Sequence, residues 1–127
     1  MQLNLNQVTV SVKNVEQSIA FYEKLGLKLI VKALPHYARF ECVSGDTTFS
    51  LHQTDEDITG NSTWIYFETE NLDADVDILI QDGIVFESLP TDQSWLWREA
   101  RCKDPDGNIL IFYYAGENRK SPPWRIQ

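Results

Sequence analysis

The feature that most constrains the fold is an internal repeat with a constant offset of 57 residues (65 − 8, 71 − 14 and 83 − 26). Both copies contain an alternating apolar segment, then an Asn before a helical pattern, then a Gly. The matched pairs are Val8 and Ile65, Asn14 and Asn71, and Gly26 and Gly83. A repeat of this length predicts two copies of one supersecondary unit, because each copy alone buries too little apolar surface.

Each part of the first copy has a local cause. Residues 7–12 alternate between polar and apolar, which predicts a strand with one apolar face. Asn14 is a favourable helix N-cap, and Gln17 stands where a capping box needs it. Gly26 can adopt the left-handed conformation that ends a helix. The second copy repeats this order, so strand, helix and strand are expected twice.

Further strands complete each half. We expect them at residues 28–33, 37–43, 47–53, 84–87, 97–103 and 108–114. The resulting fold is α+β, with two βαβββ modules forming curved mixed sheets around a cleft and helices on the outside. We expect one domain over residues 1–127, made of module 5–54, module 62–114 and a C-terminal tail, 115–127.

The segment "DPDGN" at residues 104–108 resembles the start of a calcium loop. A calcium loop of the EF-hand type needs a different Gly position and a closing Glu. Pro-Asp-Gly is also a turn signature, and a strongly apolar run follows it at once. We therefore favour a turn between the last two strands over a calcium site.

Composition excludes some classes of partner. The chain of 127 residues has a formal net charge of −8 and a pI of about 4.6, so nucleic acid and anionic membranes would repel it. No apolar stretch is long enough to span a membrane, and the start lacks signal-peptide features. Cys42 and Cys102 are expected as free thiols, which favours a cytoplasmic protein.

With these patterns in view, the chain resembles a known family. The string "NVEQSIAFYEKLGL" at residues 14–27 and "DPDGN" before the last strand are similar to the vicinal oxygen chelate superfamily. That superfamily includes glyoxalase I, bleomycin-resistance proteins, fosfomycin-resistance enzymes and extradiol dioxygenases. The resemblance covers about residues 5–114. It implies the paired βαβββ fold, and it says little about the reaction.

The resemblance also implies where a metal would be held. The enzymes of the family place ligands on four strands, at positions that here hold Gln7, Trp64, Ile111 and a residue near Phe49 or Leu51. Indole and aliphatic side chains offer a metal no lone pair. We therefore expect no catalytic divalent ion and no other cofactor. A rearranged set of Gln7, His52 and Glu68 is the alternative, although His52 also suits a surface position.

Alternation and the family register together predict the side chains that line the cleft. The expected ligand-binding residues are Gln7, Thr9, Ser11, Phe49, Leu51, Trp64, Trp95, Trp97, Ile111 and Tyr113. Apolar walls with a few polar groups are typical of a small-molecule pocket. The tryptophans can instead fill a seam or cover a sheet edge, and that alternative stays open.

Two residues are candidates for acid–base chemistry, namely Glu68 and Tyr66. A carboxylate on an inward strand position needs a partner or a ligand. Glu68 can therefore form an ion pair with Arg98 or Arg101, or act as a general base if it has no partner.

Three functions remain open from the sequence. The first is a metal-free protein that binds a small, partly aromatic or apolar molecule, in the manner of bleomycin-resistance proteins. The second is a metal-dependent lyase, isomerase or dioxygenase, and the third is a non-metal enzyme that uses Glu68 or Tyr66. We also expect a homodimer, with Trp124 of the stiff "SPPWRI" segment (residues 121–126) as an anchor, unless Trp124 folds back on its own chain.

Overall fold

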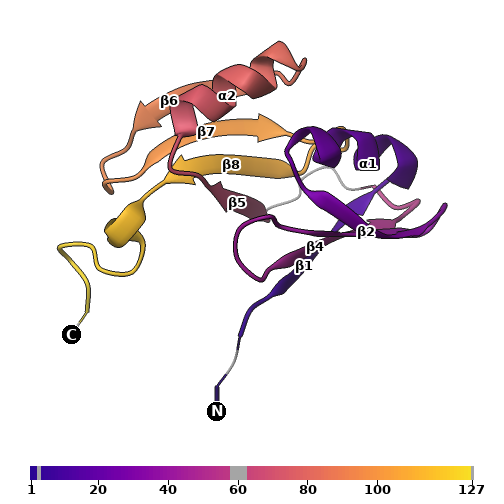
Figure 1. Ribbon diagram of the computed structural model, residues 1–127, viewed down its shortest axis with the longest axis horizontal. Coiled ribbons are helices and arrows are strands. Elements are labelled where there is room, and N and C mark those ends of the chain that lie inside the picture. The colour runs from indigo at the N-terminus through magenta and orange to yellow at the C-terminus, as the bar shows by residue number, and fades with distance from the viewer. Residues whose placement is uncertain (3, 58–62, 127) are drawn as a thin grey trace. The chain divides into compact units, whose positions relative to one another are not determined.

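The predicted α+β architecture is confirmed: a βαβββ module occurs twice, and each module forms a four-stranded mixed sheet with one helix (Figure 1). The computed structural model describes residues 1–2, 4–57 and 63–126. The chain divides into unit 1, Met1–Asn61 with Asp104–Gly107, and unit 2, Ser62–Lys103 with Asn108–Gln127.

Unit 1 holds the first sheet. Its elements are β1 (Gln7–Val12), α1 (Val15–Lys24), β2 (Lys28–Ala33), β3 (Tyr37–Glu41) and β4 (Thr48–Gln53). The strand order is β1-β4-β3-β2, and only the β1–β4 pair is parallel. Helix α1 covers one face, which buries the side chains that alternation assigned to it (Figure 1).

The first helix begins and ends where the sequence predicts. The Asn14 side chain accepts a hydrogen bond from the Gln17 backbone N–H at 2.9 Å, which satisfies one free donor of the first turn. Gly26 has φ +88° and ends the helix. Tyr22, on the buried side of α1, is fully buried, with its ring 4.8 Å from Phe49 and 6.1 Å from Phe40.

The "DPDG" segment is a turn, as expected, and it belongs with unit 1. The Gly107 N–H donates to the Asp104 carbonyl at 3.0 Å, and the Asp106 N–H donates to the Asp104 carboxylate at 2.9 Å. The Tyr22 hydroxyl donates to the same carboxylate at 2.7 Å. Within the described ranges, no three His, Cys, Asp or Glu residues are grouped so as to hold a metal ion. The carboxylate of Asp104 is therefore part of the helix packing.

Unit 2 holds the second sheet. Its elements are β5 (Trp64–Glu68), α2 (Leu72–Gln81), β6 (Phe86–Asp92), β7 (Arg98–Lys103), β8 (Ile109–Tyr114) and the 3₁₀ helix η1 (Gly116–Arg119). The strand order is β5-β8-β7-β6, with β5 and β8 parallel. Strand β6 begins later and runs further than the predicted 84–87, and two irregularities in its pairing with β7 accompany that length.

The second helix starts by a different device from the first. Asn71 stands at the N-cap, but its side chain makes no capping hydrogen bond. Thr69 replaces it: its hydroxyl donates to Asp75 at 2.6 Å and accepts from the Asn71 N–H at 3.2 Å. Both copies therefore have Asn at the N-cap, but only the Asn14 side chain makes a capping hydrogen bond.

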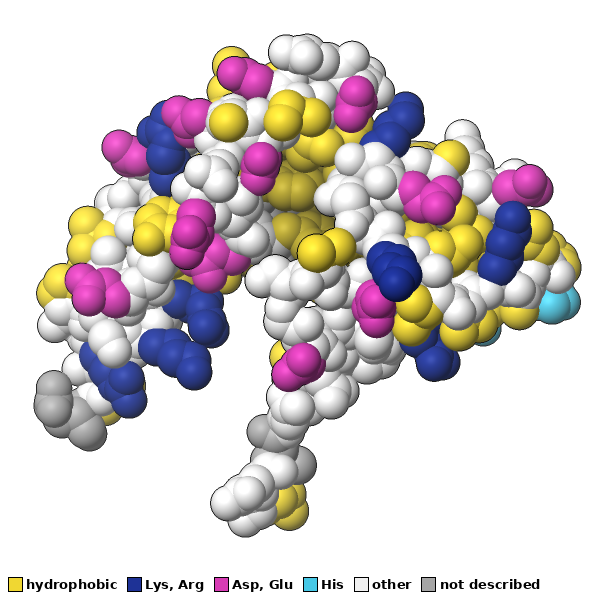
Figure 2. Space-filling model, in the orientation of Figure 1, with side chains coloured by type: hydrophobic (Ala, Val, Ile, Leu, Met, Phe, Trp, Pro, Cys, Tyr) yellow, Lys and Arg dark blue, Asp and Glu magenta, His cyan; other side chains and the backbone are white. Residues whose placement is uncertain are grey.

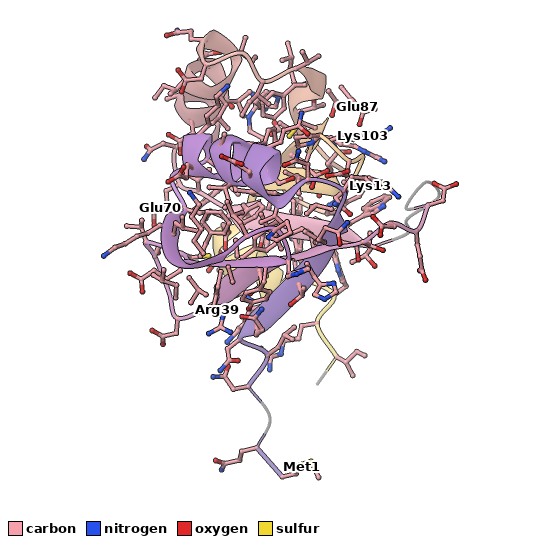
Figure 3. The ribbon with its side chains drawn as sticks, turned by 90° about the vertical axis from the view of Figure 1, so that its right-hand side faces the viewer. Met1, Lys13, Arg39, Glu70, Glu87 and Lys103 are labelled. Carbon is pink, nitrogen blue, oxygen red and sulfur yellow. The ribbon has the colours of Figure 1, made fainter. Side chains whose placement is uncertain are left out.

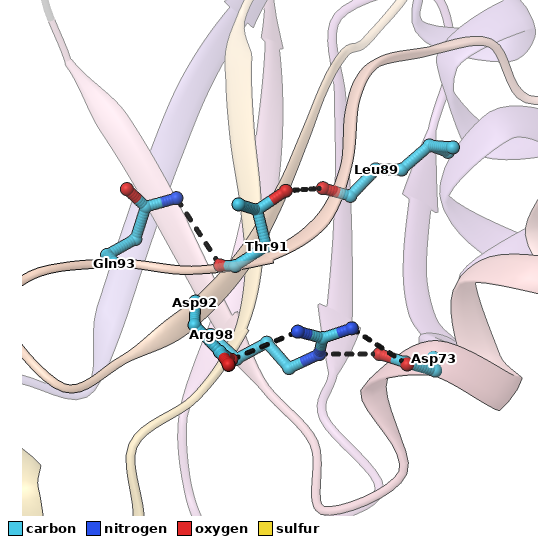
Figure 4. Close-up of polar contacts among 6 residues, drawn as sticks. All are labelled: Asp73, Leu89, Thr91, Asp92, Gln93 and Arg98. Atoms are coloured by element: carbon cyan, nitrogen blue, oxygen red, sulfur yellow. Dashed lines mark hydrogen bonds and ion pairs between the residues drawn. The ribbon is translucent and has the colours of Figure 1, made fainter.

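Arg98 links the start of α2 to the sheet (Figure 4). Its guanidinium donates two hydrogen bonds to Asp73, at 2.8 and 2.9 Å, and one to Asp92 at 3.0 Å. These hydrogen bonds, with the charge of Arg98, hold the pKa of the Asp73 carboxyl below its usual value. All three side chains are solvent-accessible, so the bridge adds little to stability.

Acidic side chains are spread over the face shown in Figure 2, with basic ones among them. In the part of the chain that the structure describes, no helix has both the length and the apolar character needed to cross a membrane.

Candidate functional site

The face of the second sheet that points away from α2 is termed the second open face. Register places these side chains on it: Trp64, Tyr66 and Glu68 from β5, Ile109, Ile111 and Tyr113 from β8, and Glu99, Arg101 and Lys103 from β7. On the opposite face, Phe67 stacks on Phe112, beside α2. The alternation along β5 and β8 thus runs as the sequence predicts.

Three aromatic rings form the centre of the second open face. The Tyr113 ring stacks on Trp97 with 4.7 Å between centroids, and the Tyr66 ring meets both edge-on, at 5.5 Å from Tyr113 and 5.9 Å from Trp97. Such pairs stabilise by about 1 kcal/mol each beyond their buried area. Tyr113 and Ile111 are buried, so these inner residues serve mainly as packing.

The outer rings of this face remain accessible. Trp64 is 47% exposed and Tyr66 is 42% exposed. The Arg101 guanidinium lies over the Trp64 ring, 4.8 Å from its centroid, in a cation–π arrangement. Trp95, in the loop before β7, is also exposed and donates from its indole N–H to Glu99 at 2.8 Å. These rings form an accessible aromatic surface beside one cation, Arg101, and one anion, Glu99.

Tyr66 is suited to donating a proton and not to accepting one. Burial raises its pKa, the negative charge of Glu99 raises it further, and Arg101 offsets only part of the shift. Burial and the charge of Glu68 raise the pKa of Tyr113 in the same way. At neutral pH both phenols therefore keep their protons.

Glu68 has a partner, but it is neither of the two expected. Its carboxylate accepts hydrogen bonds from the backbone N–H groups of Ala115 and Gly116, at 2.9 and 3.0 Å, and lies 3.7 Å from the Arg119 guanidinium. The predicted pairing with Arg98 or Arg101 is wrong, because the segment after β8 turns back as η1 and reaches Glu68 first. These contacts give Glu68 a structural role at the start of η1.

The first open face is the face of the first sheet that points away from α1. Gln7, Thr9 and Ser11 lie on it, as alternation predicts. Their partners on β4 are Thr48, Ser50 and His52.

The expectation that Phe49 or Leu51 lies on this face is wrong, since both are buried on the side of α1. The physical reason is that the second half is longer than the first. Strand pairing makes Ser50 the equivalent of Ile111, so the offset between the two halves at the last strand is 61 (111 − 50). The four additional residues of the second half shift the register.

A chain of hydrogen bonds crosses the first open face and joins Gln7 and Thr9, which the sequence singled out, to Ser50, Tyr37 and Arg39, which it did not. The Gln7 amide donates to the Ser50 hydroxyl at 2.7 Å and to Thr9 at 3.1 Å. The Ser50 and Tyr37 hydroxyls are 2.7 Å apart, and Arg39 Nε donates to the Tyr37 oxygen at 2.9 Å. Figure 3 shows Arg39 on the side of the sheet away from α1. The alternation along β3 was the sequence signal that could have placed Tyr37 and Arg39 on this face.

Tyr37 differs from the two tyrosines of unit 2. Burial raises its pKa, but hydrogen bonds with Ser50 and Arg39 and the positive charge of Arg39 together lower it below the usual tyrosine value. The phenolate form of Tyr37 is therefore the form that its neighbours stabilise.

The residues at the family's metal positions do not fit a divalent ion. Trp64 lies beneath the Arg101 cation, and Ile111 is packed with Tyr113. The Gln7 side-chain oxygen accepts from Thr48, and its amide nitrogen donates to Ser50. A site needs about three oxygen, nitrogen or sulfur donors from the protein, and these positions supply one amide and the Ser50 hydroxyl, which is already bonded to Gln7 and Tyr37.

A separate cavity of about 330 Å³ lies in unit 1 beside the start of α1. Its walls are Lys13, Asn14, Val15, Glu16, Leu34, Pro35 and Gln53, none of which the sequence analysis selected as a ligand-binding residue. The Lys13 ammonium donates to the Glu56 carbonyl, and its backbone N–H donates to Asp106 at 3.0 Å. These contacts make the wall near Lys13 part of the scaffold.

Two comparisons with known sequences agree with the resemblance. The family model described as Glyoxalase/Bleomycin resistance protein/Dioxygenase superfamily matches residues 4–112. The chain is also 32% identical over 133 aligned positions to the trivalent organoarsenical cleaving enzyme of Bacillus sp. (strain MD1), covering 91% of this chain and 78% of that protein.

Solved structures share the fold. A glyoxalase/bleomycin resistance protein/dioxygenase from Nocardioides has a TM-score of 0.81 and 20% identity, over 100% of this chain and 91% of that one. Lactoylglutathione lyase from Agrobacterium tumefaciens has a TM-score of 0.72 and 15% identity, over 87% and 92% of the two chains. With a family model that spans most of its length, the chain belongs to the Glyoxalase/Bleomycin resistance protein/Dioxygenase superfamily.

Proposed function

We propose that the protein binds a small, partly aromatic molecule on the second open face without the help of a metal ion. The observation that carries this proposal is the pair of exposed rings, Trp64 and Tyr66, next to the Arg101 guanidinium. An aromatic ligand can stack on Trp64 while Arg101 or Glu99 binds its polar group. Tyr113 and Trp97 support the outer rings from beneath.

The surroundings of the two acid–base candidates support binding over acid–base catalysis. Glu68 and Tyr66, the two acid–base candidates on this face, are a bound carboxylate and a phenol with a raised pKa. Neither is arranged to remove a proton near neutral pH. The aromatic side chains, by contrast, offer a large surface with few rotatable bonds.

A thermal-shift screen with small aromatic compounds tests the proposal. We expect at least one compound to raise the melting temperature of the wild-type protein and to quench tryptophan fluorescence. Trp64→Ala should weaken the binding of that compound about tenfold or more. Tyr114→Ala is the matched control, because Tyr114 is an exposed aromatic of the same sheet whose register places it on the other face. Equal loss in both variants, or no binder at all, would contradict the proposal.

Cleavage of an organoarsenical is the second candidate, favoured by the 32% identity with the Bacillus enzyme. A trivalent arsenic centre is soft and prefers thiolate ligands. Here Cys102 is fully buried on the α2 side of the second sheet, and burial raises the pKa of the Cys42 thiol. Neither thiol belongs to the second open face, which is why binding ranks first.

This candidate has its own experiment. The protein, purified without chelator or nickel, is analysed for metals and then incubated with a trivalent organoarsenical and added Zn²⁺, Ni²⁺, Mn²⁺ or Fe²⁺. We expect no stoichiometric metal and no release of inorganic arsenite. Stoichiometric metal that is lost in Gln7→Ala, or arsenite release that depends on added metal, would contradict the binding proposal and support organoarsenical cleavage.

We also propose that the chain forms a homodimer through its C-terminal segment. Trp124 is 57% exposed and Ile126 is 91% exposed, directly after the stiff Pro122-Pro123 pair. Sedimentation at micromolar concentration should give twice the chain mass of 14.7 kDa, and Trp124→Ala should lower it. A species of single-chain mass would refute the dimer.

A further inference from the structure

We propose that the second open face receives the C-terminal segment of a second copy of this chain, with Trp124 of that copy stacked against Trp64 and Tyr66. The inference rests on the aromatic binding and on the dimer proposed above, and it states where the two meet. A partner chain and a small aromatic molecule would compete for one surface, so dimer formation would regulate ligand binding.

Residues 120–126, termed the C-terminal turn, hold an indole ring in water. The Arg125 backbone N–H donates to the Pro122 carbonyl at 3.0 Å, and the Arg125 guanidinium donates to the Lys120 carbonyl at 3.0 Å. The proline pair restricts the backbone further. Trp124 lies inside this ordered turn and is exposed. An ordered, exposed Trp is typical of an interface anchor, because little conformational entropy is left to lose on docking.

The 3₁₀ helix η1 fixes the place of the C-terminal turn. Glu68 binds a backbone N–H and the guanidinium of η1, and the Trp97 indole N–H donates to an η1 carbonyl. Figure 1 shows the segment projecting beyond the end of β8. Among the residues that the structure describes, no aromatic ring contacts Trp124. A second copy can therefore bury Trp124 while the contacts of η1 stay intact.

Charge favours a second copy of this chain as the partner. The segment 115–127 has three basic residues and one acidic residue, namely Arg119, Lys120, Arg125 and Glu117. Its net charge is +2, whereas the whole chain has −8, so residues 1–114 carry −10 (−8 − 2). Figure 2 shows Lys and Arg side chains gathered near the C-terminal end. A basic segment is attracted to the acidic body of another copy.

The second open face offers a matching anion beside its rings. Glu99 accepts from the Trp95 indole and, within the described ranges, forms no ion pair. In the turn, Arg125 uses one terminal nitrogen, and its Nε and other terminal nitrogen make no hydrogen bond with described residues. Arg125 of one copy can therefore bind Glu99 of the other while the neighbouring Trp124 stacks on Tyr66.

The cation of the second open face does not oppose this docking. Arg101 lies 3.7 Å from the Glu87 carboxylate, which is also 3.5 Å from the Lys103 ammonium. The Arg101 charge is thus partly balanced within its own chain, and Glu99 is left to attract a basic segment.

The contact can form twice in one dimer. Because η1 follows β8 directly, each copy has its C-terminal turn at an end of the face that would receive the partner's turn. A twofold axis allows each copy to give one turn and to receive the other. An aromatic molecule bound at Trp64 would exclude the partner's indole, so each should weaken the affinity for the other by the same factor.

The first test mixes two variants that lack opposite halves of the contact. Trp64→Ala keeps the turn and loses a receiving ring, whereas Trp124→Ala keeps the ring and loses the anchor. Each variant alone should dimerise about tenfold more weakly than the wild type. One variant is labelled with ¹⁵N, because the two have the same mass, and native mass spectrometry of an equimolar mixture should show more heterodimer than either homodimer.

Ile78→Ala is the matched control for the first test. Ile78 is an exposed apolar residue of α2, on the side of the sheet opposite the second open face. This variant should dimerise like the wild type.

The second test uses a synthetic peptide, KSPPWRI, with the sequence of residues 120–126. The peptide should bind to Trp124→Ala protein, and in excess it should shift the wild type toward the single-chain mass. The same peptide carrying Trp124→Ala should do neither. Glu99→Gln in the protein should weaken the peptide severalfold and reduce the salt dependence of binding, although Gln can still accept from Trp95.

Each result decides the inference. An excess of heterodimer, together with peptide binding that needs Trp64, supports it. A mixture with no more heterodimer than homodimer, or a peptide that binds Trp64→Ala as tightly as Trp124→Ala, overturns it, and so does a wild type of single-chain mass that binds no peptide. The thermal-shift screen decides the binding of small aromatic molecules separately, so either idea can fail while the other stands.

Discussion

The two sheets share a plan and differ in their open faces. On the helix side, apolar residues match across the repeat, as Val8 and Ile65 do. On the open side the same offset matches Gln7 with Trp64 and Thr9 with Tyr66. One face became a hydrogen-bonded network and the other an aromatic surface. The helix side therefore maintains the fold, while the open side is free to take on chemistry.

The arginines make the same contrast at one position. Arg39 and Arg101 occupy equivalent places, because Arg39 pairs with Ser50 and Arg101 pairs with Ile111. Arg39 donates to a phenol and lowers its pKa, whereas Arg101 lies over an indole ring. Both cations lie over an aromatic ring, since the Arg39 guanidinium is 5.4 Å from the Tyr37 centroid, but Arg39 also donates a hydrogen bond to the phenol beneath it.

The largest expected effect separates the two sides of each sheet. Phe40→Ala and Phe112→Ala should each lower the free energy of unfolding by about 3–5 kcal/mol, because both rings are buried against a helix. Trp64→Ala, on the open side, should cost less than about 1 kcal/mol. Urea denaturation measures all three. A cost for Trp64→Ala equal to that of Phe112→Ala would mean that the open side contributes as much to stability as the helix side.

A second prediction divides the aromatic face itself. Trp97→Ala should lower the free energy of unfolding by about 2 kcal/mol, since its ring stacks on Tyr113 and its indole N–H donates to the Asn118 carbonyl at 3.3 Å. Trp64→Ala removes a more exposed ring and serves as the control. The opposite order of costs would show that Trp64, and not Trp97, holds this face together.

The two helix starts offer a third test. Asn14→Ala should cost about 1 kcal/mol, because it removes a capping hydrogen bond. Asn71→Ala should cost only a fraction of that, since its side chain makes no such bond, and Thr69→Val should cost more than Asn71→Ala. Thermal unfolding of the three variants measures this. Equal losses at Asn14 and Asn71 would mean that both caps act alike in solution.

The smallest expected effect is the response of stability to alkaline pH. Between the lowered pKa of Tyr37 and the usual value of 10.0, the unfolded chain binds more protons than the folded one, so Tyr37 makes the free energy of unfolding rise with pH. Tyr66, whose pKa is raised, makes it fall above 10.0. Subtracting the curves of Tyr37→Phe and Tyr66→Phe from the wild-type curve should give opposite slopes. Slopes of the same sign would contradict the assignment.

Much of the fold could be predicted because its signals are local. Period-two alternation, Asn14 before the first helix and a Gly after each helix act through neighbouring residues. The candidate sites depend on pairing between distant strands. Four additional residues in the second half shift the register there, so that Ser50 and not Phe49 lies on the first open face. The partner of Glu68 came from the segment after β8, whose path no periodicity describes.

The turn at residues 104–107 bears on how the protein is made. It is encoded in the second half of the chain, yet it belongs to unit 1, where the Asp104 carboxylate accepts from the buried Tyr22 hydroxyl. During synthesis the ribosome releases α1 long before residue 104 exists. The first unit therefore completes its contacts only when nearly the whole chain has emerged, and a gene fragment ending near residue 61 would encode an incomplete module.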